Sequence, residues 1–169
     1  MPSASLIKEF EQLVGKENVF SSEADRQSYA YDAAVLKPMI PSLVVRPTEV
    51  EQLGQVVKRC YEEGIPMTVR GSGTNLTGGT IPDCSDTIVI LTTGLNKILE
   101  INTEDLYATV QPGVITAKFA AAVAKACSIL GSMSCPPSAA TSRKAQAACA
   151  ASSGTTKDYV MGGSLRQHR

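Results

Sequence analysis

A run of small and polar residues at positions 70–79 has the composition best suited to ligand chemistry in this chain. It reads Arg-Gly-Ser-Gly-Thr-Asn-Leu-Thr-Gly-Gly. Glycine reaches positive φ without steric penalty, so closely spaced glycines let successive backbone N–H groups converge on an anion such as a phosphate. Arg70 at the mouth of the run adds a permanent charge whose hydrogen bonds are worth about 1.5–3 kcal/mol each. We therefore predict a phosphate-binding loop.

The residues before this loop predict the elements that position it. Residues 42–46 form a short apolar run that suits a buried strand. Thr48 and Glu51 form a capping box that begins a helix, and Gly64 stands where a left-handed cap would end it. With residues 66–70 as the next strand, this segment predicts a right-handed βαβ unit with parallel strands. The loop then leaves the carboxyl end of a strand, where open α/β sheets bind ligands.

The pattern changes after the loop. Residues 87–91 are a continuous apolar run, 97–101 suit a further strand, and 106–110 alternate between apolar and polar. Turn-forming residues at 102–105 separate the last two, so we expect this part to be antiparallel. Small and apolar residues at helical spacing over 119–127 predict a helix that packs closely on the sheet.

The ends of the chain give weaker patterns. Apolar residues at helical spacing predict a helix over 6–14 that ends near Gly15. Residues 18–39 are turn-like and show no periodicity. Alanine, serine and proline dominate residues 128–153, and we assign no strand there.

The overall composition limits the kinds of partner that we expect for the chain. The chain has 169 residues and zero formal net charge, so it offers no basic field for nucleic acid. It has no signal-peptide pattern and no apolar run near the ~20 residues needed to span a bilayer, which leads us to expect a cytoplasmic protein without a membrane span.

The cysteines and the histidine leave little room for metal or disulfide chemistry. The single histidine is His168, and the cysteines contain no Cys-x-x-Cys pair. An odd number of cysteines without metal-ligand spacing is typical of buried free thiols, so we expect no metal site and no disulfide framework. The five cysteines are Cys60, Cys84, Cys127, Cys135 and Cys149.

Three kinds of phosphate-binding loop compete for residues 70–79. A dinucleotide fingerprint, Gly-x-Gly-x-x-Gly, fails because Leu76 stands in place of the third glycine. A Walker A loop fails because Gly79 replaces the lysine. Both motifs also need a helix directly after the loop, whereas Pro82, Asp83 and Asp86 follow here. The third kind holds a pyrophosphate with its own amides and needs no helix.

This third interpretation agrees with a resemblance to a known family. The loop, residues 41–46 and the Val-Gln-Pro-Gly-Val segment at 110–114 resemble the FAD-binding domain shared by vanillyl-alcohol oxidase and p-cresol methylhydroxylase. Within that superfamily the chain is most similar to the group of the glycolate oxidase GlcD subunit and D-lactate dehydrogenase. The resemblance is continuous over about residues 42–129.

The resemblance implies an α+β fold of the PCMH type, named after p-cresol methylhydroxylase, with a partial FAD-binding domain at 41–162. A small βαβ subdomain (42–81) would precede a second subdomain (82–162) with a mixed, mainly antiparallel sheet and helices. Residues 1–40 would form a helix and an irregular lead-in, and 163–169 a tail. The implied FAD contacts are Arg70, Gly71, Ser72, Gly73, Thr74, Asn75, Leu76, Gly78, Gly79, Pro112 and Gly113; the last two have the alternative role of ending a strand.

The mode of FAD attachment follows from one position in the loop. Some members of the family carry a histidine, at about the place of Thr74, that bonds covalently to the flavin ring. Threonine cannot form that bond, so the resemblance implies that FAD is held non-covalently at this loop.

The resemblance breaks down over residues 130–154. The family has a Thr-x-Gly-Gly-Asn-x-Ala run and an Asn-x-Gly-Gly stretch that wraps the flavin, whereas residues 145–153 are alanine, glutamine, cysteine and serine. Alanine does not permit the positive φ and the close backbone approach that glycine permits, so we expect an incomplete second wall of the site. The substrate-binding cap domain of the relatives is missing, and we expect a truncated relative with an incomplete C-terminal part.

Two functions of different classes follow. The first is FAD-dependent oxidation of a D-2-hydroxy acid, such as glycolate or D-lactate, by a dehydrogenase or oxidase, for which we identify no catalytic residue in the chain. The second is a non-catalytic remnant, or a flavin-binding module whose site another subunit completes. A reductase of enolpyruvyl-UDP-sugars and a P-loop-like nucleotide binder are further alternatives.

Overall fold

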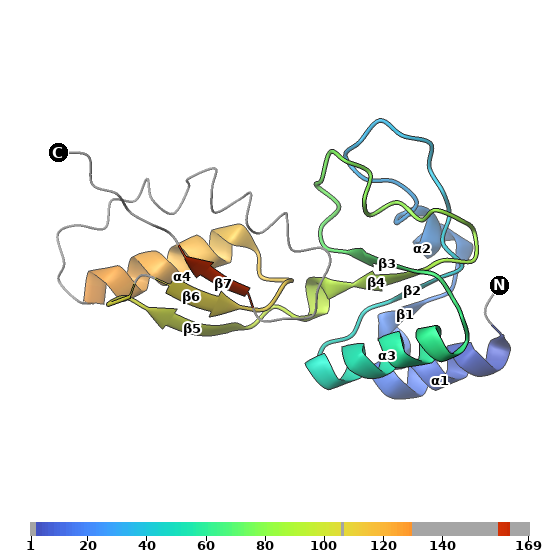
Figure 1. Ribbon diagram of the computed structural model, residues 1–169, viewed down its shortest axis with the longest axis horizontal. Coiled ribbons are helices and arrows are strands. Elements are labelled where there is room, and N and C mark those ends of the chain that lie inside the picture. Colours follow the sequence, from blue (N-terminus) through green and yellow to red (C-terminus); the bar gives the residue numbers. More distant parts are fainter. Residues whose placement is uncertain (1–2, 106, 130–158, 163–169) are drawn as a thin grey trace. The chain divides into compact units, whose positions relative to one another are not determined.

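The computed structural model describes residues 3–105, 107–129 and 159–162. The chain divides into two compact units, Met1–Leu95 and Asn96–Arg169, which are coloured blue to green and yellow to red in Figure 1. The predicted subdomain boundary between residues 81 and 82 is corrected by this division, because β4 (Ile88–Leu91) lies inside the sheet of the first unit.

The first unit is built on a four-stranded sheet with the strand order β1-β2-β4-β3. β1 (Val19–Phe20) is antiparallel to β2 (Leu43–Val45), and both β2 and β3 (Met67–Arg70) run parallel to β4. The predicted βαβ unit is confirmed in its elements and in its parallel direction. Its two strands are not neighbours, however, because β4 lies between them.

The central strands are buried on both faces, which explains their continuous apolar runs. Alternate side chains of β2 and β4 enter two different apolar clusters. In the larger cluster the strands pack against α1 (Ala4–Val14) and α3 (Val50–Glu62), which cover one face of the sheet (Figure 1). The smaller cluster contains Val44, Val89 and Leu91, with Phe20 and Tyr29 packed against it.

The two long helices begin and end for identifiable reasons. The Ser3 side chain accepts a hydrogen bond from the N–H of Leu6 at 3.2 Å and starts α1, and Gly15 at φ 90° ends it, as predicted. The predicted capping box of α3 is wrong by one residue. Gln52, in place of Glu51, supplies the acceptor, and its Oε1 receives the N–H groups of Thr48 at 3.0 Å and Glu49 at 3.2 Å.

The end of α3 matches the prediction. Gly64 directly follows the last helical turn with φ 64°, a left-handed conformation that favours glycine. The segment without sequence periodicity, by contrast, contains short elements that were not predicted. They are the 3₁₀ turn η1 (Lys16–Asn18), the strand β1 and the five-residue helix α2 (Glu23–Gln27).

The second unit contains the antiparallel sheet. Its strands β5 (Ile98–Asn102), β6 (Tyr107–Val110) and β7 (Tyr159–Gly162) are hydrogen-bonded in that order, and α4 (Thr116–Ile129) packs against the sheet. The predicted turn is confirmed, because Asn102 Oδ1 accepts the N–H groups of Glu104 at 2.9 Å and Asp105 at 2.8 Å. The 3₁₀ turn η2 (Thr92–Gly94) lies at the end of the first unit.

Several predictions concern residues outside the described part of the chain. They are the poorly matching segment at 130–154, the tail at 163–169, and the positions of Cys135, Cys149 and His168. Among the described helices, none is long and apolar enough to cross a membrane.

Candidate cofactor site

The glycine loop follows β3 directly, as the sequence predicts, and the chain then returns to the same sheet at β4. Two of its glycines need the left-handed region, Gly73 at φ 72° and Gly78 at φ 75°. No helix follows the loop in residues 71–87, all of which the structure describes. The loop therefore lacks the context that both a dinucleotide fingerprint and a Walker A loop require.

The backbone of the loop is rich in unused donors. Within the described chain, no backbone N–H from residue 72 to residue 79 donates a hydrogen bond to another protein group. Backbone N–H groups are strong donors that folded proteins rarely leave without an acceptor. A turn that collects such groups suits an anion, so the loop fits one phosphate-bearing wall of an FAD site.

Exposed hydroxyls add to these donors. Ser72 Oγ and Thr74 Oγ1 lie 3.4 Å apart, and both side chains are exposed on the loop. Hydroxyl groups can donate to phosphate oxygens as the backbone amides do. Leu76 is also turned outward, with 77% of its surface exposed.

Arg70 does not lie at the mouth of the loop, which corrects the prediction. Its side chain is buried, and Nη1 donates to the carbonyl of Tyr31 at 2.6 Å. The guanidinium carbon also lies 5.7 Å from the ring centroid of Tyr29, a cation–π distance. Burial lowers the pKa of Arg70, and the nearby Asp32 carboxylate opposes that shift. Arg70 therefore anchors the segment before β2 through its bond to Tyr31.

Arg70 also explains why residue 73 is glycine. A Cβ on Gly73 would collide with the guanidinium group of Arg70. That group is fixed by its bond to Tyr31, so it cannot move aside without losing the bond. The loop thus passes directly over the arginine side chain.

A segment that the sequence left without assignment packs on this loop. We call residues 29–36 the strap. The N–H of Ala33 donates to the carbonyl of Gly73 at 3.1 Å, and a Cβ on Gly78 would collide with Leu36. The strap therefore contacts both left-handed glycines, which fixes its position against the loop.

Asp32 is the functional candidate that sequence reasoning missed. Its Oδ1 accepts the N–H of Ala34 at 2.8 Å, and its Oδ2 accepts from Asn75 Nδ2 at 2.8 Å. The Thr80 hydroxyl lies 3.1 Å from the same Oδ2. A single acidic residue in an aperiodic segment gives no spacing signal, and its partners lie 43 and 48 residues away.

Asp32 is held in its ionised form. Desolvation raises the pKa of its carboxyl, but the hydrogen bonds from Ala34, Asn75 and Thr80 outweigh that effect. The positive charge of Arg70 also lowers the pKa of Asp32. The net result is a pKa below the usual value of 3.8.

The predicted contacts in the second unit lie in a turn. Pro112 and Gly113 follow β6, and the N–H of Val114 donates to the carbonyl of Gln111 at 3.2 Å. This arrangement ends the strand, which is the alternative role weighed from the sequence. A contact between these residues and FAD stays a prediction.

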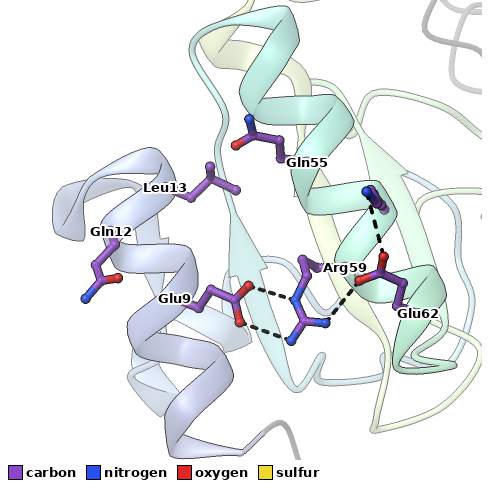
Figure 2. Close-up of a pocket in the computed structure, with 7 residues that line it drawn as sticks. Glu9, Gln12, Leu13, Gln55, Arg59 and Glu62 are labelled. Atoms are coloured by element: carbon purple, nitrogen blue, oxygen red, sulfur yellow. Dashed lines mark hydrogen bonds and ion pairs between the residues drawn. The ribbon is translucent and has the colours of Figure 1, made fainter.

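A surface depression with a volume of about 440 Å³ lies between α1 and α3 (Figure 2). Arg59 at its centre donates to Glu9 at 2.7 Å and lies 3.1 Å from both Glu62 and Glu63, contacts that raise its pKa. Lys58 lies 3.9 Å from Glu62. Every charged group that lines the depression has an opposite partner, so we assign it the role of joining the two helices.

The thiols follow the prediction in part. Cys60 is free and buried, and burial raises its pKa to about 11. Cys84 is also free but exposed, which corrects the expectation that all thiols are buried. No cluster of metal-ligating side chains occurs among the residues that the structure describes.

The fold and the loop together define a class. Parallel strands covered by helices, an amide-lined glycine loop after one of those strands, and a following antiparallel sheet form an α+β domain suited to a phosphate-bearing cofactor. The family model described as "FAD binding domain" matches residues 41–165. The chain belongs to this family of FAD-binding domains, whose cofactor is FAD.

Individual relatives agree with this assignment. The "Glycolate oxidase subunit GlcD" of Bacillus subtilis is 44% identical over 105 residues, which are 62% of this chain and 22% of that protein. The "D-lactate dehydrogenase" of Anaerostipes hadrus is 29% identical over 110 residues, which are 65% of this chain and 23% of that protein. The chain thus spans about a quarter of the length of these relatives.

Solved structures show the same fold. A 4-ethylphenol oxidase from Gulosibacter chungangensis superposes with a TM-score of 0.66 at 31% identity, covering 73% of this chain and 24% of that one. A p-cresol methylhydroxylase with bound substrate gives 0.65 at 28% identity, covering 72% and 24%. The predicted PCMH-type fold is therefore confirmed.

Proposed function

We propose that this chain holds the pyrophosphate of FAD in its glycine loop, as the cofactor-binding part of an oxidoreductase that acts on D-2-hydroxy acids. The backbone N–H groups of residues 72–79, which donate to no other group among the described residues, carry the proposal. Membership of the FAD-binding family supports the identity of the anion. The substrate class is supported by the likeness to proteins named glycolate oxidase subunit and D-lactate dehydrogenase.

The residues of the loop have distinct roles in this proposal. The backbone of Gly71, Gly78 and Gly79 approaches the pyrophosphate closely, and Gly73 supplies the left-handed bend over Arg70. The exposed hydroxyls of the loop donate to phosphate oxygens, while Asn75 shapes the loop through its bond to the strap. The flavin itself supplies the hydride acceptor. Thr74 leaves the cofactor non-covalent at this loop.

A second candidate function is a flavin-binding module whose site is completed by another subunit. The name of the B. subtilis relative as a subunit favours it. One glycine loop provides donors for a pyrophosphate but does not enclose a flavin ring. In this case the chain binds FAD and shows no turnover alone. The cytoplasmic location stays a prediction.

Titration with FAD tests the proposal and separates the candidates. The purified chain is titrated with FAD, and binding is measured by calorimetry and by the change in flavin fluorescence. The loaded protein is then mixed with D-lactate or glycolate and an artificial electron acceptor. Binding with turnover supports the oxidoreductase, and binding without turnover supports the module. A chain that binds no FAD contradicts both.

A further inference from the structure

The strap and the glycine loop meet at one carboxylate. Asp32 Oδ2 receives the side chain of Asn75 from the middle of the loop and that of Thr80 from its end. The Thr80 hydroxyl also lies 3.0 Å from Asn75 Oδ1, so the three side chains form a closed cluster. Thr80 is buried, with 5% of its surface exposed. The cluster therefore ties two points of the loop to one point of the strap.

The carboxylate is itself fixed from the other side. Its Oδ1 accepts the N–H of Ala34, two residues along its own chain, which sets the orientation of the group. The strap is further fixed by the bond from Arg70 to the carbonyl of Tyr31 and by the backbone bond from Ala33 to Gly73. Asp32 is therefore a rigid acceptor.

The hydrogen bonds of Asp32 explain how the loop can keep its shape before a ligand binds. Within the part of the chain that the structure describes, the N–H groups of residues 72–79 donate no hydrogen bond, so the ladder contacts that stabilise helices and strands do not hold the loop in shape. A loop that is ordered only when the ligand arrives loses affinity to the entropy of ordering. Hydrogen bonds between the Asp32 carboxylate and the side chains of Asn75 and Thr80 can hold the loop while leaving its backbone amides available.

We propose that Asp32 is a positioning residue for the cofactor, and that through its hydrogen bonds to Asn75 and Thr80 it holds the glycine loop in its anion-receiving shape before the cofactor binds. The inference rests on the proposed function for the identity of the anion. The shape of the unliganded loop does not depend on that identity and can be measured separately.

The charges around Asp32 are consistent with this role. Both carboxylate oxygens face donors of the protein, and Arg70 is the charged group near it. The positive charge of Arg70 favours the ionised form of the Asp32 carboxylate. The cofactor anion therefore meets backbone amides and hydroxyls, while the Asp32 carboxylate is engaged by its own donors.

Three variants separate the hydrogen bonds from the charge. Asp32→Ala removes both acceptors. Asp32→Asn keeps Oδ1 for Ala34, and a flipped Asn75 amide can accept from the new Nδ2, so the hydrogen bonds survive without the charge. Asp83→Ala removes an exposed carboxylate just after the loop and is the matched control.

The first measurement is hydrogen exchange of the chain without FAD. Asp32→Ala is expected to speed exchange of the Ala33 and Ile81 amides, which bond to Gly73 and Gly78, by roughly tenfold, because a lost charge-assisted bond has about that weight. Amides of α3 serve as the internal reference for intact folding. Asp32→Asn is expected to stay within about threefold of the natural chain, and Asp83→Ala to match it.

The second measurement is the affinity for FAD of the same proteins, and Asp32→Ala is expected to weaken it by about tenfold. The proposal is overturned if Asp32→Ala matches Asp83→Ala in exchange or in affinity, or if Asp32→Asn is as damaging as Asp32→Ala. If Asp32→Ala also disturbs α3, Thr80→Val, which removes one donor, replaces it under the same criteria. If the natural chain binds no FAD, the proposed function fails, and the exchange experiment still decides whether Asp32 orders the loop.

Discussion

Replacing Gly73 by alanine tests the geometry of the glycine loop most sharply. At φ 72° a Cβ costs roughly 1–2 kcal/mol. The same Cβ would displace the Arg70 guanidinium from the carbonyl of Tyr31, and a charge-assisted hydrogen bond is worth about 1.5–3 kcal/mol. We therefore expect Gly73→Ala to lower the free energy of unfolding by about 3–4 kcal/mol.

Gly64→Ala is the matched control for this substitution. Gly64 has φ 64°, and no atom lies within 4 Å of a Cβ built there. Gly64→Ala is therefore expected to lower the free energy of unfolding by the conformational cost alone, about 1–2 kcal/mol. The difference between the variants, about 2 kcal/mol, measures the packing of Arg70 under the loop.

The assay is urea unfolding of both variants, followed by FAD titration well below their midpoints. We expect Gly73→Ala to bind FAD at least about tenfold more weakly than the natural chain, and Gly64→Ala to bind it normally. Equal stability losses in the two variants would refute the packing of Arg70 beneath Gly73. Normal FAD affinity in Gly73→Ala would refute the role of the loop.

Further predictions concern stability at low pH, the reactivity of the thiols and substitutions in the core. The pKa of Asp32 lies below its usual value of 3.8 in the folded chain, so its contribution to stability is present above about that pH and is lost as the pH falls through the folded pKa; Asp32→Asn should flatten this fall in acid unfolding curves. At pH 8, iodoacetamide should label Cys84 and spare Cys60, whose pKa is raised to about 11 by burial, as peptide mass spectrometry will show. Equal labelling of Cys60 and Cys84 in the folded chain would contradict the burial of Cys60 in the core. Phe10→Ala should cost about 3–5 kcal/mol in urea unfolding, whereas Leu76→Ala, at an exposed position, should change stability by less than about 0.5 kcal/mol.

Local patterns predicted the elements around the loop well. The apolar run at 42–46, the strand at 66–70 and the left-handed Gly64 were predictable because burial and capping act over a few residues. The glycine loop was located by composition for the same reason. The one-residue error in the capping box arose because glutamine at 52 and glutamate at 51 are equally good acceptors on paper.

Long-range contacts account for what the sequence did not show. An arginine beside glycines suggests an anion, but Arg70 bonds instead to a carbonyl 39 residues earlier. The place of β4 between β2 and β3 depends on strand pairing, which a buried apolar run does not encode. The strap shows no hydrophobic periodicity in its sequence because it packs against a loop. The role of Asp32 was therefore found only in the structure.

Backbone NMR of the isotope-labelled chain during an FAD titration shows which amides receive the cofactor. We expect the largest amide shifts on residues 72–79, whose N–H groups make no hydrogen bond within the described chain. Shifts that instead gather around Arg59, in the depression between α1 and α3, would contradict it, as would a titration without any shift.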